Sequence, residues 1–201
     1  MIFDFPLLPL IGFAVAASIT PGPNNVLVAA NAAQNGLRAT VPHMLGISTG
    51  FSLMIVLVGL GLAGLLAEFP LVGQIMRWAS LAWLLYLAWG IATAPVPGEI
   101  GKPGFRFGFI RAMLFQWVNP KAWLLAISIA SAWVSPARPM LPQLLVICAV
   151  FFVACPPCCL PWALLGTGAA RVLGSPDRLR WFNIAMAVLL VVSMVPVALG
   201  E

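Results

Sequence analysis

The sequence predicts an all-α integral membrane protein with six transmembrane helices, arranged in a single domain, 1–201, as two inverted three-helix repeats. Of the 201 residues, 62% are hydrophobic and only 7% are charged, whereas a soluble domain carries about 25% charge. The apolar residues gather in six long segments, close to the roughly 20 residues that a spanning helix needs. Prolines interrupt the first and fourth segments near their middles, so these two helices are predicted to be broken.

The six apolar segments follow one another with short polar stretches between them. They are Leu7–Ala33, Val41–Leu66, Leu71–Ala94, Phe105–Trp133, Leu141–Leu165 and Arg180–Leu199. The first is expected to be a retained span rather than a cleaved signal, because Met1–Pro6 contains an aspartate and no basic residue. In the fifth, Pro156, Pro157 and Pro161 predict another irregular helix.

A turn-rich stretch from residue 95 to 104 separates the third segment from the fourth. Its prolines, glycines and charges are typical of a linker, so we expect a first repeat over about 1–94 and a second over about 105–201. Because three spans precede the linker, the second half enters the membrane from the opposite side. Two related halves would then form an inverted repeat, an arrangement found in many transporters.

Basic residues in the loops predict the orientation of the spans, since cytoplasmic loops carry an excess of lysine and arginine. The loops after the first, third and fifth segments hold seven: Arg38, Lys102, Arg106, Arg111, Arg171, Arg178 and Arg180. The opposite side holds two, Arg77 and Arg138. The odd-numbered loops are therefore expected in the cytoplasm, and both termini are expected on the periplasmic or extracellular side.

The first predicted break is the run Pro21-Gly22-Pro23-Asn24-Asn25. Its two prolines remove backbone donors, so the preceding carbonyls lose their helical partners. Lipid cannot satisfy such groups, and protein or a water-filled cavity must do so. Exposed carbonyls can bind a cation, while the asparagine amides at the start of the resumed helix can bind a carboxylate. The break therefore suits an amino acid, which carries both charges; a simple packing kink is the alternative.

The second predicted break is Asn119-Pro120, and Lys121 follows it at the first turn of the resumed helix. A charge inside the membrane is by default a functional feature. A cation at a helix N-terminus opposes the helix dipole, so Lys121 needs a carboxylate, freed carbonyls or water nearby. A substrate carboxylate is one candidate; a lysine that reaches the membrane surface is the alternative. Gln116, one turn before the break, is a further candidate site residue.

The four cysteines are Cys148, Cys155, Cys158 and Cys159, and all lie in the fifth segment. They cannot connect distant parts of the chain, so a disulfide framework is not expected. The spacing of the last three could suit a soft metal or a redox pair, but free cysteine is also common as a small buried apolar residue. No cofactor or metal site is predicted. The basic residues form no stripe, so no nucleic acid partner is expected.

With these motifs in place, the chain resembles the LysE/RhtB family of bacterial amino-acid exporters over nearly its whole length. The residues that carry the resemblance are Thr20-Pro21-Gly22-Pro23, Gly36, Gly46, Gly50, Gly108-Phe109, Asn119-Pro120-Lys121-Ala122, Leu84-Leu85-Tyr86-Leu87, Trp162-Ala163-Leu164-Leu165-Gly166 and Arg180-Trp181-Phe182-Asn183. The resemblance implies a transporter, not an enzyme, that exports amino acids or close derivatives across the bacterial plasma membrane. It also implies a proton motive force as driving force, and homo-oligomers.

The chain departs from the family pattern in three ways. It has Gln116 where many members have asparagine, it lacks the acidic residues found within some members' spans, and its Cys155-Pro156-Pro157-Cys158-Cys159 run is not a general family feature. Two alternatives use that run: a membrane thiol–disulfide electron carrier and a heavy-metal exporter. The candidate substrate-binding residues are Pro21, Gly22, Pro23, Asn24, Asn25, Gln116, Asn119, Pro120 and Lys121.

Overall fold

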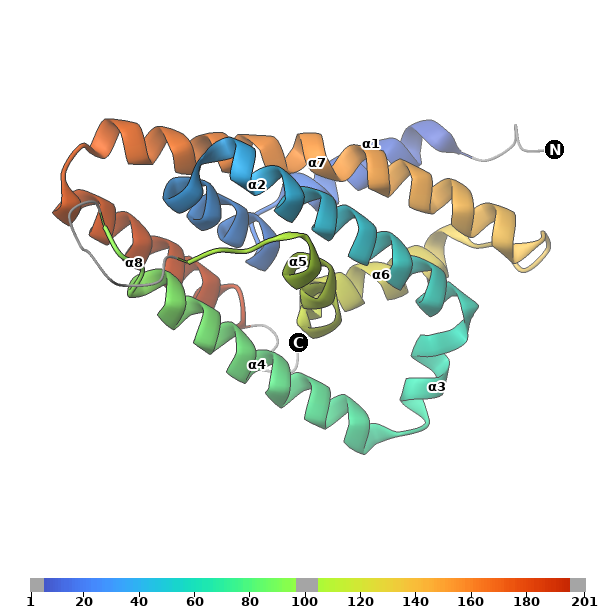
Figure 1. The fold of residues 1–201 in the computed structure, drawn as a ribbon. Helices are drawn as coiled ribbons and strands as arrows, with labels where there is room; N and C mark the ends of the chain where they lie inside the picture. The colour runs from blue at the N-terminus through green and yellow to red at the C-terminus, as the bar shows by residue number, and fades with distance from the viewer. Residues whose placement is uncertain (1–5, 97–104, 196–201) are drawn as a thin grey trace.

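The computed structural model describes residues 6–96 and 105–195, and within these ranges the chain is helical with no strand. Figure 1 shows the arrangement of the helices. Their bounds are α1 Leu7–Ile19, α2 Pro23–Leu57, a π-helical turn Val58–Leu62, α3 Ala63–Ala67, α4 Pro70–Ala92, α5 Phe109–Phe115, a 3-10 turn Gln116–Val118, α6 Pro120–Trp133, α7 Met140–Leu173 and α8 Pro176–Val192.

Three stretches in the described part of the chain are long and apolar enough to cross a membrane: Pro23–Leu66, Leu71–Ala92 and Met140–Leu173. Two shorter apolar helices, Leu7–Ile19 and Phe109–Val118, accompany them. The two short helices are the first parts of the two segments predicted to be broken. Helix stops at Ile19 and resumes at Pro23, and it stops again at Val118 and resumes at Pro120, so both interruptions lie where the sequence predicts them.

Helix α2 contains the first unpredicted feature, a change of direction at Gly36 (Figure 1). Gly36 has φ 79° and ψ 169°, a backbone conformation that favours glycine because it has no Cβ. The first and second predicted segments are therefore joined by a turn at one residue rather than by a loop over residues 34–40. A second glycine with positive φ, Gly61 at 109°, lies in the π-helical turn before α3.

The fourth predicted segment becomes helical at Phe109 rather than at Phe105. The reason is a pair of hydrogen bonds between the Asn31 carboxamide and the backbone of Phe107. The Phe107 N–H donates to Asn31 Oδ1 at 2.9 Å, and Asn31 Nδ2 donates to the Phe107 carbonyl at 3.2 Å. Asn35 Nδ2 donates to the Phe105 carbonyl at 2.7 Å. These bonds replace helical partners and hold the entry to α5 against α2.

Helix α7 corrects the prediction of an irregular fifth segment, because it runs unbroken through Pro156, Pro157 and Pro161. Pro156 has no N–H to donate to the carbonyl four residues earlier, that of Phe152. The Ser48 hydroxyl of α2 donates to this carbonyl at 2.9 Å instead. A hydroxyl from a neighbouring helix is one of the ways in which membrane proteins satisfy a backbone group freed by proline.

Helix α2 packs against α7 and α5 through glycines, while α4 packs mainly against α8. A Cβ atom built on Gly50 would lie 2.5 Å from the Met113 carbonyl oxygen, and one on Gly46 would overlap the Phe109 carbonyl. A Cβ on Gly166 of α7 would likewise overlap the Ala29 carbonyl of α2. Small residues permit this close approach of backbones. The packing brings α5, α6 and α7 around the start of α2, where the first break lies.

Two predicted boundaries fall partly on residues outside the described ranges. These are the linker predicted over 95–104 and the last segment predicted over Arg180–Leu199. In the described part, the last helix begins earlier than predicted, at Pro176, and ends at Val192. Ser175 caps it by accepting a hydrogen bond from the Arg178 backbone N–H.

Candidate functional site

The first break leaves the last carbonyls of α1 without helical partners, and nearby side chains donate to them. The Thr20 hydroxyl donates to the carbonyls of Ala16 at 2.6 Å and Ala17 at 3.0 Å. Asn25 Nδ2 donates to the carbonyls of Ser18 at 2.9 Å and of Thr20 at 2.8 Å. Thr20 and Asn25 therefore act as a local cap, which satisfies the terminal groups that every helix end leaves open.

Distant parts of the chain complete this cap. Pro23 frees the Ile19 carbonyl, and the indole Nε1 of Trp162 in α7 donates to it at 3.0 Å. Lys121 Nζ, at the start of α6, donates to the carbonyls of Thr20 at 3.2 Å and Pro21 at 3.3 Å. The carbonyls of residues 16 to 21 all have donors. Three different helices therefore hold the first break in place.

Lys121 is the direct connection between the two breaks. An ammonium group has three N–H donors and no acceptor, and two carbonyls of the first break are its partners. No acidic side chain in residues 6–96 and 105–195 forms an ion pair with it. Within the described residues, carbonyl dipoles balance the positive charge, and a third N–H can serve an anionic ligand. A Cβ on Gly22 would lie 3.0 Å from the Lys121 side chain, which explains the small residue there.

A second connection between the breaks joins two carboxamides. Asn24 Nδ2 donates to Gln116 Oε1 at 2.9 Å, and Gln116 Nε2 donates back to Asn24 Oδ1 at 3.1 Å. Gln116 Nε2 also donates to the Ala112 carbonyl of its own helix at 2.9 Å. Gln116 is fully buried, so this reciprocal pair lies behind the breaks rather than on an open surface. Its geometry serves to hold α2 and the end of α5 together.

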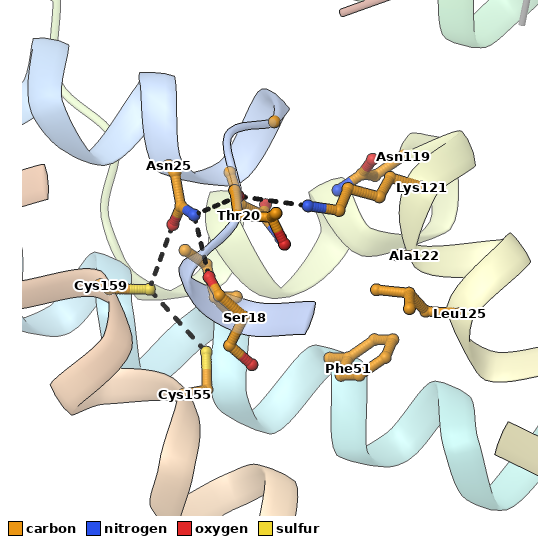
Figure 2. Close-up of a pocket in the computed structure, with 13 residues that line it drawn as sticks. Ser18, Thr20, Asn25, Phe51, Asn119, Lys121, Ala122, Leu125, Cys155 and Cys159 are labelled. Atoms are coloured by element: carbon orange, nitrogen blue, oxygen red, sulfur yellow. Dashed lines mark hydrogen bonds between the residues drawn. The ribbon is translucent and has the colours of Figure 1, made fainter. Parts of the chain in front are cut away.

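A cavity of about 50 Å³ opens where the breaks meet (Figure 2). Its lining comes from the end of α1, both breaks, α2, α6 and α7: Ser18, Thr20, Gly22, Asn24, Asn25, Ile47, Phe51, Asn119, Lys121, Ala122, Leu125, Cys155 and Cys159. A cavity needs roughly 10–15 Å³ to hold one water, so this cavity has room for a few waters. It is polar on the side of the breaks and apolar on the side of Ile47, Phe51 and Leu125.

Asn119 differs from the other asparagines of the cavity. Its side chain is only 1% exposed, and its Oδ1 has no hydrogen-bond partner in the described part of the chain. A buried acceptor without a donor is costly, by about 1–3 kcal/mol. Because Asn119 lines the cavity, its carboxamide is open to a ligand that brings a donor, such as an ammonium group.

The nine residues predicted for the site divide into three groups. Gly22, Asn24, Asn25, Asn119 and Lys121 line the cavity. Gln116 lies behind the cavity and bonds Asn24. Pro21, Pro23 and Pro120 interrupt the helices but are not part of the lining. The structure therefore brings together residues from both breaks, which lie about one hundred positions apart.

Several lining residues were not predicted from the sequence. Ile47, Phe51 and Leu125 are apolar residues in apolar helices, and nothing in their local pattern separates them from lipid-facing neighbours. Cys155 and Cys159 stand four positions apart, which places them on one face of α7. That spacing indicates a shared environment, but it does not reveal which helix they face.

A larger cavity, of about 660 Å³, lies between α4 and residues 105–118, which include α5, and it shares no lining residue with the first. Trp83 and Trp89 line it together with Arg106 and Arg111. Tryptophans near arginines are typical of the level of the lipid headgroups. None of the nine predicted site residues is part of its lining.

These features define a class: a multi-pass membrane protein whose two broken helices meet around a small cavity, as in secondary transporters. The model of the LysE type translocator family matches residues 15–199, and the chain belongs to this family. It is therefore a transporter and not an enzyme.

Named relatives agree with this assignment. A "Cysteine/O-acetylserine efflux protein" of Salmonella typhimurium is 33% identical over 186 residues, which cover 89% of this chain and 90% of that protein. The protein of the same name from Escherichia coli K12 is 31% identical over the same share of both chains. No solved structure matches the chain significantly.

Proposed function

We propose that this protein exports amino acids or close derivatives across the bacterial plasma membrane, driven by the proton motive force. Its six spans are residues 7–35, 37–67, 70–92, 109–133, 140–173 and 176 onward. The first three and the last three form the two inverted repeats. The orientation of the spans is part of the proposal: seven basic residues lie in or near the connections on one side and two on the other, which supports both termini on the periplasmic side.

The observation that carries this proposal is the position of Lys121. Its ammonium lies at the cavity, has no carboxylate partner in the part of the chain that the structure describes, and holds two carbonyls of the opposite break. A substrate carboxylate that enters the cavity is a stronger partner than a neutral carbonyl, because hydrogen bonds between ionised groups are about twice as strong. Lys121 would then pass from the carbonyls of Thr20 and Pro21 to the substrate.

The substrate ammonium would bind on the polar side of the same cavity. Asn119 Oδ1 supplies an acceptor without a present donor, and the carbonyls of Thr20 and Pro21 become free acceptors once Lys121 leaves them. Both charged groups of an amino acid would thus have a partner: Lys121 for the carboxylate, and Asn119 with the freed carbonyls for the ammonium. The side chain of the substrate would face Ile47, Phe51 and Leu125.

The size of the cavity and the names of the relatives support a small substrate. At about 50 Å³, the cavity holds a few waters but no amino acid, so binding requires that the two halves move apart. Loss of the Lys121 bonds would remove one of the contacts between the two halves, which the Asn24–Gln116 pair also joins. Relatives named for cysteine and O-acetylserine efflux favour compact polar amino acids of that kind.

The two cysteine-based alternatives gain no support from the geometry. In the described ranges, no three potential metal ligands among histidine, cysteine, aspartate and glutamate come together. Cys155 and Cys159 are neighbours, but the Cys158 sulfur lies beside the Val15 carbonyl at 3.9 Å. All four cysteines lie on α7 and are free thiols, so no pair bridges two helices.

The proposal is tested with purified protein in liposomes that are preloaded with one labelled amino acid at a time. We expect O-acetylserine or cysteine to leave faster than from protein-free liposomes, and external acidification to accelerate this efflux. An uncoupler should remove the acceleration. A panel in which no amino acid leaves faster than from protein-free liposomes would contradict the proposed function. An efflux rate that does not depend on the pH gradient would contradict only the proposed driving force.

A further inference from the structure

The cavity contains a pair of thiols that the proposed transport reaction does not use. Cys155 and Cys159 lie one turn apart on α7, and their sulfur atoms are 3.9 Å from each other. Both side chains are buried, yet both line the cavity (Figure 2). Cys148 and Cys158 are not part of this lining. From this placement we infer that Cys155 and Cys159 form a dithiol binding site for a thiophilic metalloid, with trivalent arsenic as the chemical class.

The distance between the sulfurs suits a single bridging atom. A metal or metalloid bonded to sulfur at about 2.3 Å, the length of a zinc–thiolate bond, would span 3.9 Å at an S–M–S angle of roughly 115°. Thiolates are soft ligands that select soft centres over hard ones. With one further ligand of its own, a trivalent aryl arsenical needs only two sulfurs from the protein. The two facing thiols are therefore sufficient as protein ligands, and the aryl group enters when the two halves move apart, because the cavity of about 50 Å³ is too small for it.

The binding step is an exchange without oxidation or reduction. An aryl arsenic oxide, R–As=O, reacts with two thiols to form R–As(S–Cys)₂ and one molecule of water. Two As–S bonds form, the As–O bond breaks, and both thiol protons leave with the oxygen. No oxidant and no reductant takes part, and arsenic remains trivalent.

Arsenic bound at this site would change the hydrogen bonds of Asn25 and thereby affect the first break. The Cys159 thiol lies 3.7 Å from Asn25 Oδ1 and donates to it. Asn25 in turn caps the carbonyls of Ser18 and Thr20. When arsenic replaces the thiol proton, Asn25 loses this donor and the cavity loses its free volume. Bound arsenic should therefore block transport, a consequence that rests on the proposed function, whereas binding itself does not.

The test measures binding first, with phenylarsine oxide as the probe and the purified full-length protein in detergent. Intact-protein mass spectrometry should show one arsenical per chain, and the number of titratable thiols should fall from four to two. The double variant C148S/C158S should still bind one arsenical. The single variants C155S and C159S should each bind at least tenfold more weakly. An excess of 2,3-dimercaptopropanol should remove the arsenical from the wild type.

Several outcomes would overturn the inference. Loss of binding in C148S/C158S would assign the site to another pair, and so would unchanged binding in C155S or C159S. The thiol count in the unmodified chain needs no variant, so an unfolded variant cannot hide a failure: a count that stays at four disproves the site. Transport is measured separately. Inhibition by phenylarsine oxide in C148S/C158S but not in C159S would confirm the link to the cavity, and uninhibited transport with arsenic bound would refute it.

Discussion

The ammonium of Lys121 lies 3.2 Å from the carbonyl oxygen of Thr20, across 101 positions of the sequence. This contact joins the two broken helices at one point and brings a positive charge to the wall of a small cavity. It also gives the first break an intramolecular cation where other transporters use a bound ion at unwound carbonyls.

The Asn24–Gln116 pair should couple the two breaks energetically. Each carboxamide donates to the other, and polar pairs in membrane proteins contribute about 0.6 kcal/mol on average, up to about 1.7. We expect a double-mutant cycle of N24A and Q116A to give a coupling of this size in the free energy of unfolding. A cycle of N24A with S128A should give none, because the Ser128 hydroxyl bonds its own helix at the exposed face. Equal couplings in both cycles would contradict the pairing.

Ser48 should stabilise α7 by replacing the donor that Pro156 lacks. S48A would leave the Phe152 carbonyl without its donor, at a cost of about 1–3 kcal/mol in the free energy of unfolding. T49A is the matched control, since Thr49 donates to the Leu45 carbonyl of its own helix at an exposed position. P156A returns the backbone N–H, so S48A should cost much less in a P156A background. An equal cost in both backgrounds would refute this explanation.

Trp162 should stabilise the first break through one hydrogen bond. W162F keeps an aromatic ring but removes the Nε1 donor from the Ile19 carbonyl, so we expect a loss of about 1 kcal/mol in the free energy of unfolding. Trp181, which is 70% exposed, provides the comparison: W181F should change the unfolding free energy by less than about 0.5 kcal/mol. Thermal unfolding in detergent measures both. Equal shifts for the two variants would argue against the bond.

Asn119 should contribute to substrate affinity rather than to stability. N119L removes a buried oxygen that has no partner in the described structure, so the protein should be no less stable than the wild type. If that oxygen accepts from the substrate ammonium, the variant should raise the KM for efflux about tenfold or more, since hydrogen bonds to charged groups contribute about 1.5–3 kcal/mol. A lower stability with an unchanged KM would assign Asn119 a structural role only.

The parts of this molecule that follow from local chemistry could be predicted from the sequence. Proline cannot donate a backbone hydrogen bond, so the breaks at Pro21 and Pro120 and the place of Lys121 beside the second break followed directly. The uninterrupted α7 did not follow, because the carbonyl that Pro156 frees accepts its hydrogen bond from Ser48 of another helix. Likewise, the partners of Asn25 and the approach of Cys155 and Cys159 to the cavity depend on helix packing. A break can be predicted from its own residues. The donors that bond its freed carbonyls can be named only when the neighbouring helices are known.

The role of Asn25 illustrates the same limit. Its position after the prolines suggested a substrate ligand, and it does line the cavity. However, its Nδ2 already donates to two carbonyls of the break, so little donor capacity remains for a ligand. Among the described residues that line the cavity, Asn119 has the buried polar atom without a partner, and the sequence indicated it mainly through its place before Pro120.

The most direct test of the central claim compares efflux of the transported amino acid with efflux of its carboxamide, which lacks the carboxylate charge. With wild-type protein, the amino acid should have a kcat/KM about 10- to 150-fold higher, as expected for one hydrogen bond to a charged group. With K121M this preference should disappear, whereas K121R should retain part of it. R138M, which removes an exposed cation from a loop, should leave the preference intact. A K121M protein that still prefers the amino acid to its carboxamide by the wild-type factor would contradict the proposal that Lys121 binds the substrate carboxylate.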